Sequence, residues 1–357
     1  MNKKLLPLAI SAALAAGVAA PGSASADVTI YGKLHVSLDY FKVDSNRDFR
    51  ATGFEGDGTS DVQVSSNSSR IGFKGSEDLG GGLKAIWQIE SGVNLNNGNG
   101  EWSSRNSFLG LSGGWGTFIA GKHDTPMKIV SRKLDPFGDT IFDTRAIMGS
   151  DILGNNQFNL RTNNTVAYIS PSWSGFSIIG AYVADWSDNS SRPSDNDWSA
   201  FSASATYSNG PIYAAIAWEK HKVGDIAGIN NPDEPSMFRG GASYKFGAFA
   251  LGFAAEKGKD DLVDRWAGNV FGTYGFGNNT IKLQYTRAGE TINNDESWMW
   301  SVGFDHKFSA RTKVYAAAGQ LKQDGAARYV LGGGHNTNTF NTAAPSEDQN
   351  AVSIGLV

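Results

Sequence analysis

Apolar and polar residues alternate with a period of two along most of the chain after residue 26. The pattern is clear in the ranges 28–40, 238–246, 281–286 and 298–308, where most alternate positions hold an aliphatic or aromatic residue. A period of two is that of a β-strand whose two faces meet different surroundings. The pattern therefore predicts an all-β chain.

Seven short clusters of turn-forming residues interrupt this alternation. They are DLGGG at 78–82, GGWG at 113–116, WSG at 173–175, NGP at 209–211, FGA at 246–248, GFGNN at 275–279 and FSAR at 308–311. Longer polar stretches lie between them, and this alternation of short turns and long loops is typical of an antiparallel meander that crosses a membrane. Seven turns that join strands in pairs, with one further strand at each end, predict sixteen strands.

A soluble β-sandwich would show the same alternation, so charge and aromatic residues decide between the two folds. Charged residues keep to one parity through many strands, which suits a wet lumen inside an apolar belt. Aromatic residues lie beside the turns, as in the girdles of membrane barrels: Trp115, Phe118, Trp173, Phe176, Tyr207, Phe246, Phe249, Phe276 and Phe308. We therefore predict a transmembrane antiparallel β-barrel.

The first 26 residues are predicted to be a secretory signal peptide, which leaves 27–357 as the barrel domain. Lys3 and Lys4 precede the apolar stretch Leu5–Ala20, and Ala24-Ser25-Ala26 is a small-residue cleavage signature. The alternative is a membrane anchor, but the apolar stretch is shorter than the span of about 20 residues that an anchor needs.

Charge and composition exclude several function classes. Residues 27–357 hold 29 basic and 35 acidic residues, a net charge of −6, which argues against nucleic acid as a partner and favours a weak cation preference. The five histidines have no zinc-like spacing, and no Gly-x-Ser-x-Gly motif occurs, so we expect no enzyme, metal or cofactor. Acidic pairs in predicted loops, Asp195/Asp197 and Asp260-Asp261, leave calcium binding open, although solvated loop charge explains them as well.

Three segments carry a resemblance to a known family. DVTIYGKLHVSLDY, SSRIGFKGSEDLGGGLKAIWQIE and RNSFLGLSGGWGTFIAGKHDTP resemble the general bacterial porins of the trimeric, sixteen-stranded type. The resemblance implies an outer-membrane homotrimer of water-filled channels for ions and small hydrophilic solutes, in contact with lipid and lipopolysaccharide. It also implies that the external loop Asn94–Ser104 reaches a neighbouring copy. Family members usually end in an aromatic residue, whereas this sequence stops at Ser353–Val357, so we expect a short closing strand.

One interval between turns is abnormally long, because Gly116 and Trp173 are 57 residues apart. The surplus lies in Asp124–Arg161, and a loop of this length is usually functional. Its PFGD segment, 136–139, resembles the tip of the loop that narrows the pore in the family. That match implies an acidic side of the constriction formed by Asp135, Asp139 and Asp143. It implies a basic wall formed by Lys33, Arg70, Lys74, Arg105 and Arg161.

A passive channel is thus the function that the sequence favours. Two alternatives remain: an outer-membrane enzyme built on a barrel, and a structural or adhesive barrel with a plugged lumen. The first would need a His-based constellation at one rim, and the second would lack the long third loop.

Overall fold

A computed structural model describes residues 27–44, 58–150, 158–186, 198–222, 234–259, 264–291, 295–325, 327–332 and 347–357. The predicted signal peptide and both candidate calcium-binding pairs lie outside these residues. None of the helices in the described ranges is long and apolar enough to cross a membrane.

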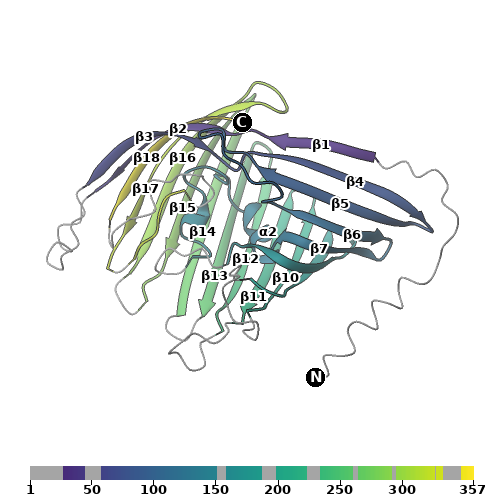
Figure 1. The fold of residues 1–357 in the computed structure, drawn as a ribbon. Coiled ribbons are helices and arrows are strands. Elements are labelled where there is room, and N and C mark those ends of the chain that lie inside the picture. Colours follow the sequence, from purple (N-terminus) through teal and green to yellow (C-terminus); the bar gives the residue numbers. More distant parts are fainter. Residues whose placement is uncertain are drawn as a thin grey trace.

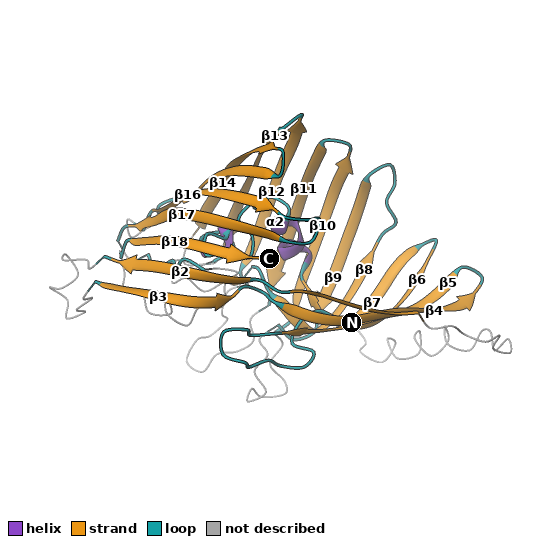
Figure 2. Cartoon of the chain, turned by 90° about the horizontal axis from the view of Figure 1, so that it is seen from above, coloured by secondary structure: helices purple, strands orange, loops and turns teal. Residues whose placement is uncertain are grey.

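The described residues form one antiparallel sheet of eighteen strands (Figures 1 and 2). The first nine are β1 (Asp27–Lys33), β2 (Val36–Val43), β3 (Thr59–Ser66), β4 (Arg70–Gly80), β5 (Leu83–Gly92), β6 (Ser107–Gly113), β7 (Gly116–Asp124), β8 (Arg161–Ile169) and β9 (Phe176–Val183). The others are β10 (Ala200–Asn209), β11 (Ile212–His221), β12 (Ser236–Phe246), β13 (Phe249–Lys259), β14 (Asp264–Phe276), β15 (Asn279–Ala288), β16 (Ser297–Lys307), β17 (Lys313–Gln323) and β18 (Gln349–Leu356). The helix α2 (Pro126–Arg132) and the 3-10 helix η2 (Thr144–Ala146) lie between β7 and β8. All seven predicted short turns fall between strands.

The structure has eighteen strands in place of the predicted sixteen, because two long strands are each broken in the middle, one into β1 and β2 and the other into β3 and β4. β1 pairs with β4 and β2 pairs with β3, in registers that place Lys33 opposite Arg70 and Val36 opposite Ser66. At the break, the Ser69 hydroxyl donates to the His35 carbonyl oxygen at 3.0 Å and accepts from the His35 amide at 2.9 Å. The Ser69 side chain thus replaces a backbone partner at the break. When each broken strand is counted once, the barrel has the predicted sixteen strands.

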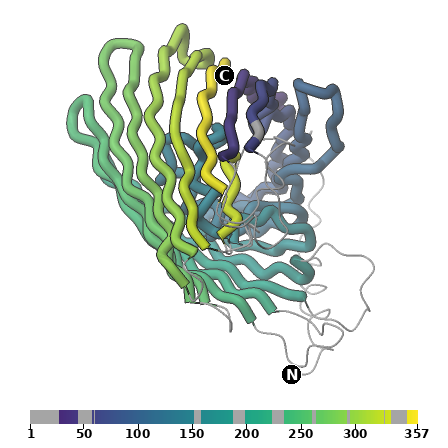
Figure 3. Tube along the Cα trace, turned by 90° about the vertical axis from the view of Figure 1, so that its left-hand side faces the viewer, coloured from purple at the N-terminus to yellow at the C-terminus, as the bar shows by residue number. Residues whose placement is uncertain are grey.

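The pairing returns to its starting point. From β4 onward each strand pairs with its neighbours in sequence, and β18 pairs with β2, with Leu356 opposite Val36. Figure 3 shows this last strand, in yellow, beside the purple N-terminal segment. The predicted closure between the first and last strands is confirmed, with the detail that β18 lies against β2, while β1 pairs with β4.

The two faces of the strands differ as predicted. On β15, for example, Leu283 is 57% exposed on the outer face, whereas its neighbour Lys282 is 5% exposed on the inner face. All nine predicted girdle aromatics are exposed on the outside. Outward apolar side chains and inward charges are the arrangement that a barrel in a bilayer requires.

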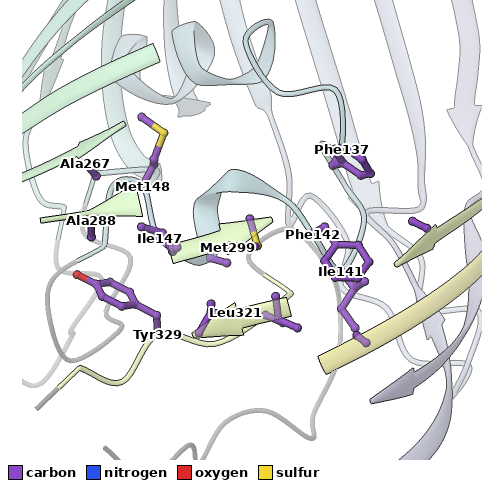
Figure 4. Close-up of a cluster of buried hydrophobic side chains, with 14 of the residues drawn as sticks. Phe137, Ile141, Phe142, Ile147, Met148, Ala267, Ala288, Met299, Leu321 and Tyr329 are labelled. Carbon is purple, nitrogen blue, oxygen red and sulfur yellow. The ribbon is translucent and has the colours of Figure 1, made fainter. Parts of the chain in front are cut away.

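The main apolar core lies inside the ring of strands. Loop residues Phe137, Ile141, Phe142 and Ile147 are fully buried against the inner face of the strands β13 to β17 (Figure 4). That face carries small residues, Ala254, Ala267, Ala288 and Ala317, which leave room for the large side chains of the loop. Apolar burial therefore docks the loop on one side of the lumen.

Candidate pore constriction

The long segment between β7 and β8 enters the barrel as the helix α2. Thr125 caps it by accepting a hydrogen bond from the Lys128 amide, and Pro126 occupies its first turn, where a missing N–H costs nothing. Met127 and Val130 are fully buried, in a cluster with inward residues of β11 and β12. Figure 2 shows α2 inside the ring of strands. The predicted loop therefore lies in the lumen where the structure describes it.

The tip of the loop is held by its own carboxylates. Asp135 accepts hydrogen bonds from the Phe137 amide at 2.8 Å and from the amide and hydroxyl of Thr144 at 2.9 and 3.1 Å. Asp143 caps η2 by accepting from the Arg145 amide at 2.9 Å, and it also accepts from the Asp139 amide at 2.9 Å. These two predicted acids thus fold the loop.

Asp139 differs from the other two acids because it reaches the barrel wall. Its carboxylate lies 3.0 Å from the Lys33 ammonium on β1. Its backbone has φ of +62°, a left-handed conformation that Asp tolerates better than most residues. Within the loop, Arg132 and Arg145 lie 3.7 and 3.5 Å from it.

The predicted basic wall residues have other partners. Arg105 and Arg70 both pair with Glu90 on β5, at 2.6 and 3.6 Å, and Glu90 also accepts a hydrogen bond from the Tyr31 hydroxyl at 3.0 Å. Arg70 is still close enough to Asp139 to interact with it electrostatically. Arg161 lies 3.0 Å from Asp124.

Lys74 contacts no carboxylate in this network. Its ammonium stands over the Tyr31 ring, 5.5 Å from the ring centre. Cation–π contacts of this kind are weaker than a buried ion pair and leave the charge available to solute. The structure thus brings Lys33 and Asp139 into direct contact, and it places Arg70, Arg105 and Arg161 around two acids that the sequence did not single out.

Those two acids are Glu90 and Asp124. The inward parity of Glu90 on β5 was the signal that could have identified it, since Lys84, Gln88 and Glu90 share one face of that strand. Asp124, the last residue of β7, is 3% exposed and pairs with Lys128, Arg132 and Arg161. The alternation of apolar and polar residues does not distinguish Asp124 from other polar residues at strand ends.

The ion pairs form two neighbouring groups, here together called the throat network, with more positive than negative charge. Glu90 with its two arginines is one group, and the acids Asp124, Asp139 and Asp143 with their partners are the other. Together they contain seven cations and four carboxylates: Lys33, Arg70, Arg105, Lys128, Arg132, Arg145 and Arg161 with Glu90, Asp124, Asp139 and Asp143. The throat is therefore cationic although residues 27–357 carry a net charge of −6. A solute responds to the charges that line its narrowest path, so the total charge is a poor guide.

Protonation of the loop follows from its surroundings. Burial raises the pKa of Asp135 to about 8, and the nearby Asp143 adds to this effect. Burial would also raise the pKa of Asp143 and Asp139, but Arg145 for the first, and Lys33, Arg132 and Arg145 for the second, hold both below their usual range. Asp139 and Asp143 are thus ionised at neutral pH, and Asp135 is largely protonated.

A cavity of about 170 Å³ opens beside the tip of the loop. Its lining includes Arg132, Asp135, Asp139, Asp143 and Arg145. Charged groups of both signs thus border open space inside the barrel, where a polar solute can be oriented by the field between them.

A ring of antiparallel strands with an apolar outer face and a charged lumen narrowed by a loop defines a transmembrane β-barrel channel. Residues 12–326 match the model of the family described as Gram-negative porin. The chain belongs to this family. It is an outer-membrane channel for the passive diffusion of small solutes, and it is not an enzyme.

Curated relatives have similar length and modest identity. Major outer membrane protein P.IB of Neisseria gonorrhoeae is 28% identical over 351 residues, covering 90% of this chain and 94% of that protein. Outer membrane porin protein 32 of Delftia acidovorans is 28% identical over 380 residues, covering 100% and 99%.

Solved structures share the fold at lower identity. The anion-selective porin from Comamonas acidovorans has a TM-score of 0.75 at 23% identity, covering 93% of this chain and 99% of that one. The trimer form of OmpT from Vibrio cholerae has a TM-score of 0.61 at 17% identity, covering 93% and 99%.

Proposed function

We propose that the channel passes small anions in preference to cations. The excess of cations over carboxylates in the throat network carries this proposal, because a narrow passage with low-dielectric walls concentrates the field of its lining charges. The porin from Comamonas acidovorans is described as anion-selective, which is a property of that protein and agrees with the charge balance here. The proposal replaces the weak cation preference that the net charge favoured.

The experiment is a reversal-potential measurement in a planar bilayer under a KCl gradient. We expect single-channel steps and a reversal potential whose sign corresponds to chloride permeation. A potassium-selective channel would contradict the anion preference alone, whereas a protein that gives no steps would be the plugged barrel of the alternative hypothesis.

We infer that the constriction lies between the loop tip and the wall formed by β1, β4, β8 and the residues that lead into β6. Asp139 is its acidic side, and Lys33, Arg70, Arg105 and Arg161 are its basic side, with Lys74 along the same wall. The contact between Lys33 and Asp139 supports this assignment. Asp135 and Asp143 support the tip and shape the field indirectly.

We also propose a homotrimer within the outer membrane. The loop 93–106 presents Trp102 with 69% exposure, and its ring lies 6.1 Å from that of Phe73 on the outer face of β4. An exposed Trp next to apolar surface suits contact with a neighbouring copy better than contact with water. Native mass spectrometry in detergent should give the mass of three copies, and Trp102→Ser should shift the population towards the monomer.

The outer face also suits contact with lipid and lipopolysaccharide. Lys322 stands over Trp298 and Arg287 over Trp266, at 5.8 and 5.9 Å from the ring centres, near the external ends of their strands. Cations above an aromatic girdle are placed at the level of anionic headgroups. Replacing both cations with Gln should reduce the lipopolysaccharide that copurifies with the protein, which a phosphate assay can measure.

A further inference from the structure

Three charged side chains form a buried cluster on the inner face of the barrel, halfway round the ring from β4 and β5. Arg239 on β12, Glu256 on β13 and Arg265 on β14 are 0%, 5% and 7% exposed. Arg239 donates from Nε to one Glu256 carboxylate oxygen at 2.8 Å, and its Nη2 lies 2.7 Å from the same oxygen. Arg265 lies 3.8 Å from the other oxygen. One carboxylate thus serves two arginines.

Each of the three side chains also contacts the constriction loop. Arg239 donates to the Met127 carbonyl oxygen at 3.2 Å and to the Asn159 side-chain oxygen at 3.0 Å. Glu256 accepts from the Gly149 amide at 2.6 Å. Arg265 donates to the carbonyl oxygens of Ile147, at 2.5 Å, and of Ser150. The cluster therefore holds the loop near its beginning, its middle and its return to β8.

The loop backbone approaches so closely that only glycine fits at its central contact. Gly149 has φ of +77°, and a Cβ there would lie 2.8 Å from Arg239 Nη2 and 2.1 Å from Asn159 Nδ2. The close approach allows the Gly149 amide to reach Glu256. The loop backbone at Gly149 and the buried cluster of Arg239, Glu256 and Arg265 are thus in close steric contact.

We propose that Glu256 is the positioning residue that fixes the constriction loop, and so the size of the open pore, by orienting Arg239 and Arg265 as a clamp on its backbone. Without the carboxylate, two neighbouring buried cations repel each other and lose their common partner. The clamp opens, and the loop leaves its single docked position. The inference rests on the proposed constriction, because the loop can set the pore size only if it forms the narrowest part of the channel.

The test compares single channels of Glu256→Gln, Glu256→Asp and the wild-type protein. Losing a hydrogen bond to a charged group shifts an equilibrium about tenfold or more. We therefore expect Glu256→Gln to raise the fraction of time spent at other conductance levels by about that factor, with greater open-channel noise. Glu256→Asp keeps the charge and should restore much of the steady open level, which a merely space-filling role of Glu256 would not predict.

Glu296→Gln is the matched control, because Glu296 pairs with Arg287 on the outer face. It should leave the single-channel records unchanged. Gly149→Ala tests the clamp from the loop side and should reproduce the noise even if Glu256→Gln fails to assemble. Records of Glu256→Gln or Gly149→Ala that match those of the wild type would overturn the proposal, whereas a wild-type protein without conductance would contradict the channel itself.

Discussion

Lys33, on the first strand, and Asp139, at the tip of the constriction loop, lie 3.0 Å apart although 106 residues separate them. The ion pair joins the loop to β1, which continues into β2, and β2 pairs with β18 next to the apolar docking surface. The tip is thus held by two kinds of contact, by buried phenylalanines against β13–β17 and by charge against β1. If the constriction lies where we propose, a solute passing beside this contact meets a carboxylate and an ammonium together, and we expect both to influence ion preference.

Replacing Asp139 with Asn should increase the preference for anions. The substitution removes one of the four carboxylates in a network of seven cations, and Asn also tolerates the left-handed backbone at this position. A charge 4 Å from a permeating ion contributes about 1 kcal/mol in water, so the permeability of each ion should change roughly fivefold, upward for the anion and downward for the cation. Reversal potentials in a KCl gradient measure the change, and Asp264→Asn, which alters an exposed ion pair with Lys257, is the control. An unchanged ratio would remove Asp139 from the constriction.

Replacing Arg70 and Arg105 together with Ala should shift the channel towards cations and raise its conductance. Two cations disappear, Glu90 loses both of its arginine partners, and side-chain volume leaves the wall. The reversal potential is therefore expected to approach zero or to change sign, and the single-channel conductance step should increase. A double variant with wild-type selectivity and step size would show that ions pass elsewhere.

Anion preference should fall as the pH rises through about 8. The pKa of Asp135 is raised to about 8 by burial and by Asp143, so the carboxyl is neutral below this value and adds a negative charge above it. Since this pKa exceeds the ordinary value of 3.8, the docked loop loses stability as pH rises from that value towards 8. Burial lowers the pKa of Lys128 to about 8 against the opposing effect of Asp124, so loss of its proton acts in the same direction.

Selectivity measured at about pH 7 and about pH 9 tests this expectation against the variant Asp135→Asn. The variant cannot ionise at this position and should retain only the smaller change that Lys128 produces. An equal pH response in both proteins would assign the effect to other groups.

The sequence predicted the barrel well because a barrel in a bilayer imposes a repeated rule on every strand. Leu283 and Lys282 occupy adjacent positions with opposite exposures, and each of the seven turns resets the same alternation. The break between β1 and β2 could not be predicted in this way. It depends on a hydrogen bond between Ser69 and His35, which are 34 positions apart and carry no periodic signal.

The constriction was predictable only in part, because its partners come from distant strands. Surplus loop length and the PFGD segment indicated where the loop turns inward, and Asp139 does contact a predicted wall residue. The sequence could not predict which of the three acids contacts the wall and which ones stabilise the loop. Asp135 and Asp139 differ in their hydrogen-bond partners and not in their spacing. The expected cation preference used the net charge of all residues, whereas the proposed anion preference uses only the charges of the throat network, outside which most carboxylates lie.

Replacing Gly303 with Ala should displace the loop tip from the wall. Gly303 lies on the inner face of β16, and a Cβ there would come within 2.8 Å of Phe137 Cε1. Phe137 is fully buried, and Lys282 stands over its ring at 4.7 Å while donating to the Pro136 carbonyl oxygen at 3.1 Å, so the ring has little freedom to yield. Overpacking of this kind costs about 1–3 kcal/mol, which is enough to move the tip into the lumen and lower the single-channel conductance. Gly268→Ala on β14, where a Cβ meets nothing closer than 3.5 Å, should leave the conductance unchanged. The double variant Gly303→Ala with Phe137→Leu restores space and should recover the wild-type step, whereas normal conductance in Gly303→Ala alone would show that Phe137 does not position the tip.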